Sequence, residues 1–134
     1  MKDIEKAKEL LLEPKTLVLV KGDTTYTSEL NGIKPLINFI SDGYDLKDFS
    51  MADKIIGKAQ SMLAVKANIK EVYAKVLSIS AKTILEKYNI PYTYDVLTEK
   101  IINRTKDDIC PMEKAVKDID DIEEAYKILK GRIN

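Results

Sequence analysis

One short segment of the chain combines a nucleophilic side chain with a helix start. Cys110, the single cysteine, stands directly before Pro111 and three residues before Glu113. Proline favours the first helical position and glutamate the third, so the segment predicts a helix with Cys110 at its N-cap. A helix start favours the thiolate, which makes Cys110 a candidate nucleophile. A small buried apolar side chain is the commoner role of a free cysteine.

A second group of candidates follows from an expected helix over residues 53–65. Asp53 would begin this helix, where its carboxylate either caps free N–H groups or carries a proton. Lys54 and Lys58 are four residues apart and would share one helix face. That face is either solvated or in contact with an anionic group. Gly57 would lie inside the helix, where glycine indicates close packing or room for a ligand.

Three further segments could contact a ligand. The loop 31–35 contains Gly32 and Lys34 and precedes a predicted helix, and amides at such a start can bind an anion, although most such loops are only turns. Ser78 ends a predicted strand, at the sheet edge where α/β proteins hold ligands, and it could equally cap the next helix. Asn103 and Arg104 could hold an anion through the guanidinium, or lie on the surface.

The elements that must position these residues alternate along the chain. A hairpin is expected where Lys21-Gly22-Asp23 joins two strands, and strands separated by helices imply parallel pairing with right-handed crossovers. We therefore expect one α/β domain over residues 1–134, a three-layer αβα arrangement with a five-stranded mixed sheet. The expected helices are 2–12, 33–40, 53–65, 80–88, 112–118 and 122–130, and the expected strands are 17–20, 24–27, 45–50, 71–78 and 90–94.

Composition restricts the classes of partner. The chain has 22 basic and 22 acidic residues among 134, so no net field attracts nucleic acid or an anionic membrane. Its seven tyrosines are scattered and form no stacking platform. The charged N-terminal stretch does not resemble a secretory signal, and no apolar run reaches the roughly 20 residues of a membrane span. We expect a cytoplasmic protein without membrane or nucleic-acid partners, and a homo-oligomer stays open.

Four stretches carry a resemblance to a known group of proteins. NGIKPL, ADKIIGKAQSML, KEVYAKVLS and ICPMEKAV resemble a small, uncharacterised prokaryotic family that is thought to share the cytidine-deaminase-like fold. The resemblance covers residues 15–130. It implies a five-stranded mixed sheet between helical layers. It implies no particular activity, because none is established for that family.

The chain departs from zinc deaminases at their metal site. Those enzymes begin one helix with His-x-Glu or Cys-x-Glu and another with Pro-Cys-x-x-Cys. By element order the two motifs fall on Met51-Ala52-Asp53 and on residues 78–83, and neither segment offers a nitrogen or sulfur ligand. The chain has no histidine and one cysteine, fewer than the three or four ligands that such a zinc site needs. We expect no zinc centre and no other cofactor.

Three functions fit these observations. The first is a metal-free, deaminase-like domain that binds a small anionic or nucleoside-like ligand through Gly32, Lys34, Lys54, Ser78, Asn103 and Arg104. The second is an enzyme or redox protein with Cys110 as the nucleophile and Asp53 as the proton carrier. The third is a structural or interaction protein without pocket chemistry. The sequence does not decide whether any reaction is catalysed.

The metal prediction is directly measurable. Protein purified without chelators should carry far less than one zinc ion per chain by elemental analysis, and it should release no ammonia from cytidine above background, because that chemistry needs a metal-activated water. One zinc per chain, lost together with folding, would contradict the prediction.

Overall fold

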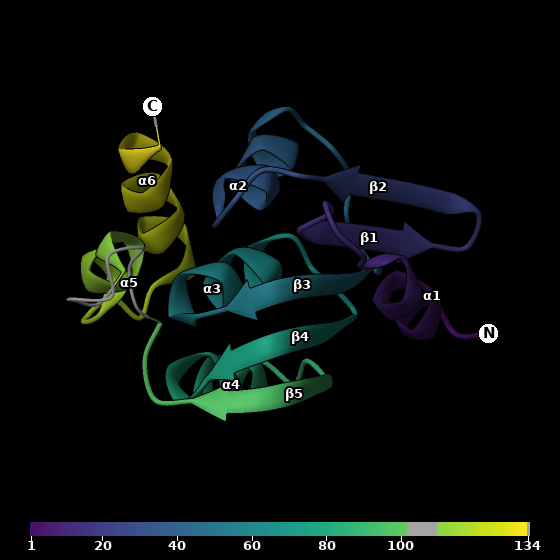
Figure 1. The fold of residues 1–134 in the computed structure, drawn as a ribbon. Coiled ribbons are helices and arrows are strands. Elements are labelled where there is room, and N and C mark those ends of the chain that lie inside the picture. Colours follow the sequence, from purple (N-terminus) through teal and green to yellow (C-terminus); the bar gives the residue numbers. More distant parts are fainter. Residues whose placement is uncertain (102–109, 134) are drawn as a thin grey trace.

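The computed structural model describes residues 1–101 and 110–133 (Figure 1). In this part of the chain, helices and strands alternate as the sequence predicts. In order they are α1 (Asp3–Leu10), β1 (Leu17–Lys21), β2 (Thr24–Ser28), α2 (Lys34–Ser41), β3 (Ser50–Ile56), α3 (Lys58–Lys66), β4 (Glu71–Ser78), α4 (Ile79–Lys87), β5 (Tyr92–Thr98), α5 (Pro111–Val116) and α6 (Ile122–Arg132).

The five strands form one mixed sheet in the order β2-β1-β3-β4-β5. β1 is antiparallel to both β2 and β3, whereas β3, β4 and β5 are parallel. The β1–β2 hairpin turns at Gly22, whose φ of 57° is a left-handed conformation that glycine adopts without steric cost. The expected α/β class with a five-stranded mixed sheet is therefore confirmed.

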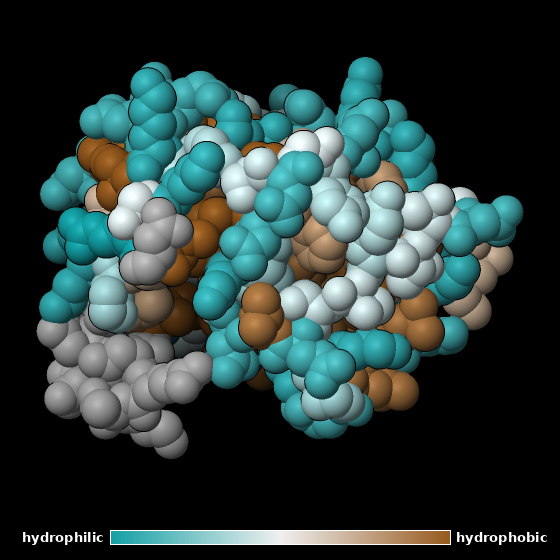
Figure 2. Space-filling view, turned by 90° about the horizontal axis from the view of Figure 1, so that it is seen from above, coloured by the Kyte–Doolittle hydropathy of each residue, from teal (hydrophilic) through white to brown (hydrophobic). Residues whose placement is uncertain are grey.

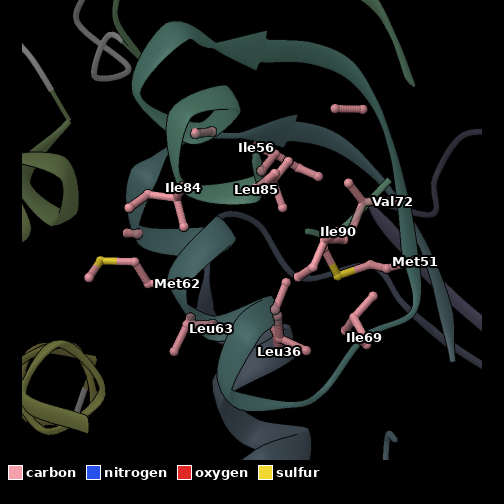
Figure 3. Packing of buried hydrophobic residues seen from close by; sticks show 14 of the residues in the cluster. Leu36, Met51, Ile56, Met62, Leu63, Ile69, Val72, Ile84, Leu85 and Ile90 are labelled. Atoms are coloured by element: carbon pink, nitrogen blue, oxygen red, sulfur yellow. The ribbon is translucent and has the colours of Figure 1, made fainter. Parts of the chain in front are cut away.

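Helices cover the two faces of the sheet unequally. Among the described helices, α1 alone packs on one face, where its Ile4 and Ala7, and Leu11 directly after it, form a cluster with side chains of β1, β3 and β4. The main core lies on the other face, between the sheet and α2, α3 and α4 (Figure 3). α5 and α6 pack against α3, on the side toward which β3, β4 and β5 run (Figure 1). The carboxyl ends of the parallel strands therefore approach α5.

The expected strand 45–50 and helix 53–65 were wrong. The strand is β3, from Ser50 to Ile56, and the helix begins only at Lys58. β3 lies in the middle of the sheet and is buried on both faces, so it lacks the alternation that marks a half-buried strand. Ile55 and Ile56, at the end of β3, have helical spacing with the apolar residues of α3. The end of β3 and α3 were therefore predicted as one helix.

The remaining elements begin within two residues of their predicted starts. The largest other difference is β5, which was expected to end at residue 94 and continues to Thr98. β5 is an edge strand whose residues are mostly exposed, so polar residues such as Asp95 do not interrupt it. Among the described residues, no helix combines the length and apolar character that a membrane span requires.

The core makes a prediction about stability. Leu63 of α3 is fully buried in the main core, whereas Leu12 is 66% exposed. Leu63→Ala should lower the free energy of unfolding by about 2–5 kcal/mol, because it removes buried methyl groups and leaves a cavity. Leu12→Ala is the matched control and should change it by less than about 0.5 kcal/mol. Urea unfolding of both variants measures the difference, and equal stabilities would refute this assignment of the core.

Candidate functional site

A cavity of about 710 Å³ lies beside the carboxyl end of β3. Six segments of the chain meet there: the residue before β1, the turn before α2, the end of β3, the first turn of α3, the segment that follows β5 and the segment that begins α5. The lining residues are Thr16, Asn31, Gly32, Ile33, Asp53, Lys54, Ile55, Gly57, Gln60, Ile101, Cys110, Pro111, Met112 and Glu113.

The cavity offers aliphatic walls with few polar groups. Ile33, Ile55, Ile101 and Met112 come from four different segments of its lining. Seen from above, the protein surface is hollowed on the side where Figure 1 places α5 and α6, and apolar side chains show inside the hollow (Figure 2). The size and the mixed lining are those of a site for a small organic molecule.

Asp53 and Gln60 form a buried polar pair in this lining. Asp53 is 6% exposed and Gln60 is 2% exposed. Gln60 Nε2 donates to Asp53 Oδ2 over 2.7 Å, and the Ile55 amide donates to Oδ1 over 3.3 Å. Burial raises the pKa of Asp53 to about 7, against the opposing effect of the hydrogen bond from Gln60. The carboxyl group therefore stands near its midpoint of titration at neutral pH, a property common at functional sites.

The side-chain oxygen of Gln60 is an acceptor that the hydrogen bond with Asp53 does not use. Gln60 Oε1 is buried, and it is the one such side-chain atom in the described part of the chain without a hydrogen-bond partner. Buried polar atoms in native proteins nearly always have a partner, either protein or water. Gln60 was not a sequence candidate, because an amide inside a helix carries no local signal of its role.

Glu113 of α5 caps α3 from outside. Its Oε1 accepts from the Lys58 amide and its Oε2 from the Ala59 amide, each over 2.8 Å. Gly57 is the N-cap residue of α3, and a Cβ built there would lie 2.3 Å from Glu113 Oε1. The sequence analysis assigned Glu113 only to the cap of its own helix. The available signal was a helix start, Gly57-Lys58-Ala59, without a capping side chain of its own.

Four of the sequence-predicted site residues meet at the cavity: Gly32, Asp53, Lys54 and Cys110. Cys110 is the N-cap residue of α5, as predicted, but its half-buried thiol makes no capping hydrogen bond. Its reactivity stays a prediction. Lys54 is paired with Glu13, and this ion pair lowers the pKa of the Glu13 carboxyl.

The helical roles expected for this region were wrong. Asp53 and Lys54 belong to β3, so Asp53 caps no helix and Lys54 shares no helix face with Lys58. Gly57 is not inside the helix but precedes it. Lys58 Nζ instead donates to the Lys117 carbonyl oxygen over 2.9 Å. The cause is the shifted boundary between β3 and α3.

The other candidates lie away from the cavity lining or outside the described residues. Lys34 is the exposed first residue of α2 and does not line the cavity. Ser78 is buried at the end of β4, where its Oγ accepts from the Ala81 amide over 3.0 Å and caps α4. Asn103 and Arg104 fall outside the described residues.

Histidine, cysteine and carboxylate side chains form no metal-binding cluster within residues 1–101 and 110–133: no group of three or more could hold an ion. Of the two segments aligned above with the deaminase motifs, one differs from that alignment. Met51-Ala52-Asp53 is a strand rather than a helix start, whereas residues 78–83 do span the start of α4.

Comparisons with known proteins give a family and a fold. The family model described as a domain of unknown function (DUF1893) matches residues 6–133. The crystal structure of a DUF1893 family protein (TM1506) from Thermotoga maritima superposes with a TM-score of 0.88 over 99% of this chain and 92% of that one, at 24% sequence identity. No curated protein matches the chain.

The raised pKa of Asp53 predicts a pH dependence of stability. The ordinary value is 3.8 and the folded value is about 7, so between these pH values the folded protein holds a proton that the unfolded chain has released. The Asp53 contribution to stability is therefore lost as pH rises through this window. At about 1.4 kcal/mol per pKa unit, the loss amounts to a few kcal/mol.

Asp53→Asn removes this titration while keeping the shape of the side chain. The difference in free energy of unfolding between wild type and Asp53→Asn should change steadily from pH 4 to pH 7, in the direction that favours the variant at higher pH. Urea unfolding at several pH values measures it. Parallel curves for the two proteins would show that Asp53 titrates alike in the folded and unfolded states.

Proposed function

Because the chain belongs to the DUF1893 family of domains of unknown function, its role must be argued from the site, and we propose that it binds a small, uncharged, nucleoside-like molecule in the cavity beside Asp53 and Gln60. This binding uses hydrogen bonds and apolar contacts from the chain itself. The lining supplies one cysteine and no histidine, so its donor set does not suit a zinc ion.

The unpartnered Oε1 of Gln60 is the observation that carries this proposal. Gln60 lines the cavity, and the hydrogen bond to Asp53 fixes its amide, which leaves Oε1 as a buried acceptor without a partner. A ligand with an N–H group would satisfy it, and heterocyclic bases carry such groups on flat apolar rings. The aliphatic lining suits the faces of such a ring, and the volume suits a molecule of nucleoside size.

Charges around the cavity favour an uncharged ligand over an anionic one. Glu113 already takes the two amides at the start of α3, where an anion would otherwise bind. Lys54 is paired with Glu13, and Lys34 lies away from the lining. The described lining therefore contains two carboxyl groups, Asp53 and Glu113, and a single lysine that is already paired.

The cytidine-deaminase-like fold belongs to the same proposal. Three helix starts border the cavity: α2, which follows the turn at Asn31 and Gly32, α3, which follows Gly57, and α5, which follows Cys110. Zinc deaminases carry their metal ligands in two short motifs, and by element order these fall here on β3, before α3, and on the start of α4. Neither segment offers a nitrogen or sulfur ligand, and the one before α3 borders the cavity, which supports ligand binding there without metal chemistry.

A cysteine-dependent activity is the second candidate. Cys110 and Asp53 are far apart in sequence, and both line the cavity. A thiol at a helix start beside a carboxyl group that titrates near neutral pH would provide a nucleophile and a proton carrier. Turnover that disappears in Cys110→Ser, while ligand binding persists, would establish this candidate over simple binding.

Binding assays with a panel of small molecules test the leading proposal. Calorimetry should detect uncharged nucleosides or bases, and Gln60→Met should weaken their binding at least about tenfold, because it replaces the acceptor by an apolar group of similar size. Lys34→Ala, an exposed position away from the lining, is the control and should leave affinity unchanged. Tighter binding of nucleoside monophosphates that Lys34→Ala abolishes, or no binding by any compound, would contradict the proposal.

A further inference from the structure

We propose that the first turn of α5 is an opening cover of the cavity, closed by the two hydrogen bonds from the Lys58 and Ala59 amides to Glu113. These two bonds are called the Glu113 latch below. The inference rests on the proposed function for its purpose, control of ligand entry, but the opening itself can be measured without a ligand.

The cavity lining divides into a fixed part and a removable part. Asp53, Ile55 and Gln60 belong to β3 and α3, inside the main body of the domain. Cys110, Pro111, Met112 and Glu113 all come from the start of α5. If the first turn of α5 moves away, the cavity loses one wall while the fixed part keeps its structure.

Few contacts hold this wall. α5 has six residues, which is too short for a helix to be stable without tertiary contacts. Its apolar anchor is the buried Val116, at the end away from the cavity. At the cavity end, the contacts are those of Glu113 and the half-buried Met112, together with one backbone hydrogen bond from the Cys110 amide to the Ile101 carbonyl oxygen over 2.9 Å. The Lys58 side chain also reaches the Lys117 carbonyl oxygen. The first turn can therefore open while Val116 stays packed.

Gly57 shows that the structure makes room for the Glu113 latch. Its φ of −102° and ψ of −174° are extended values that any residue adopts, so its backbone conformation does not require glycine. A Cβ at this position would instead collide with the Glu113 carboxylate, at 2.3 Å from Oε1 and 2.6 Å from Cδ. The absence of a side chain at Gly57 is therefore required by the contact with Glu113 of α5, and not by the backbone conformation before α3.

Because an added Cβ at Gly57 would disturb Glu113 but not the backbone, substitutions at these two residues test the latch. Gly57→Ala should displace Glu113 from the amides without straining the backbone, and Glu113→Gln should remove one of the two acceptor oxygens. Cys110 lies in the moving turn and reports its opening through alkylation by iodoacetamide. We expect each variant to raise the labelling rate of the folded protein about tenfold or more. The double variant should label no faster than the faster single one, because both changes break the same latch.

Two substitutions match these variants in chemistry and leave α5 untouched. Gly131→Ala adds a methyl group where nothing lies within 4 Å, and Glu123→Gln removes a carboxylate that pairs with Lys66 on the surface. Both should label at the wild-type rate. Leu129→Ala in α6 controls for general loss of stability. If Leu129→Ala accelerates labelling as much as the latch variants do, or if folded latch variants label at the wild-type rate, the proposal is overturned.

Hydrogen exchange of the wild-type protein covers the case in which a latch variant does not fold. The Lys58 and Ala59 amides should exchange through a local opening, at rates that low urea concentrations hardly change. Exchange of these amides only by global unfolding would overturn the proposal. Failure of nucleosides to bind, with labelling and exchange as expected, would count against the proposed function alone.

Discussion

Asp53 brings a carboxyl group into the central strand of the sheet, and the residues around it compensate for its burial. β3 lies between β1 and β4, and Asp53 is only 6% exposed, so bulk water solvates this group little. Gln60 and the Ile55 amide supply the hydrogen bonds that bulk water would otherwise provide. Burial still dominates and raises the pKa to about 7. The amide nitrogen of Gln60 donates to Asp53, so its oxygen is left as a buried acceptor without a partner, and this acceptor is the basis of the proposed ligand contact.

The start of α3 joins this buried pair to the moving part of the site. Gln60 belongs to the first turn of α3, and the two residues that begin the helix donate their amides to Glu113. A helix start usually obtains its cap from the preceding residue, but Gly57 has no side chain to give. The missing cap is supplied by α5. As a consequence, the wall of the cavity and the start of α3 are held by the same carboxylate, and the Lys58 and Ala59 amides are not available to an anionic ligand.

Local signals were enough for most of the fold. β4 was predicted with its observed bounds, because β-branched and aromatic residues alternate along it. The helix expected to end at residue 88 is followed by Asn89, whose φ of 58° is a left-handed conformation that asparagine tolerates. Residues 45–65 failed because β3 is buried on both faces, and periodicity cannot separate such a strand from an adjacent buried helix.

The site was predictable only in part. The cysteine-dependent function considered from the sequence requires Asp53 and Cys110 in one site, and both line the cavity, although Asp53 lies on a strand and not at a helix start. The contact between Gly57 and Glu113 could not be predicted, because the two residues are distant in sequence. The contact also depends on the absence of a side chain at Gly57, which leaves room for the Glu113 carboxylate. The unpartnered oxygen of Gln60 likewise depends on the three-dimensional arrangement alone.

The most direct measurement is a crystal structure of the protein with an uncharged nucleoside bound. We expect a ligand N–H group at about 2.7–3.2 Å from Gln60 Oε1, with the hydrogen bond between Gln60 and Asp53 retained and the ring of the ligand against the aliphatic lining. A ligand bound elsewhere, or a Gln60 oxygen that keeps the same fixed water with and without the ligand, would contradict it.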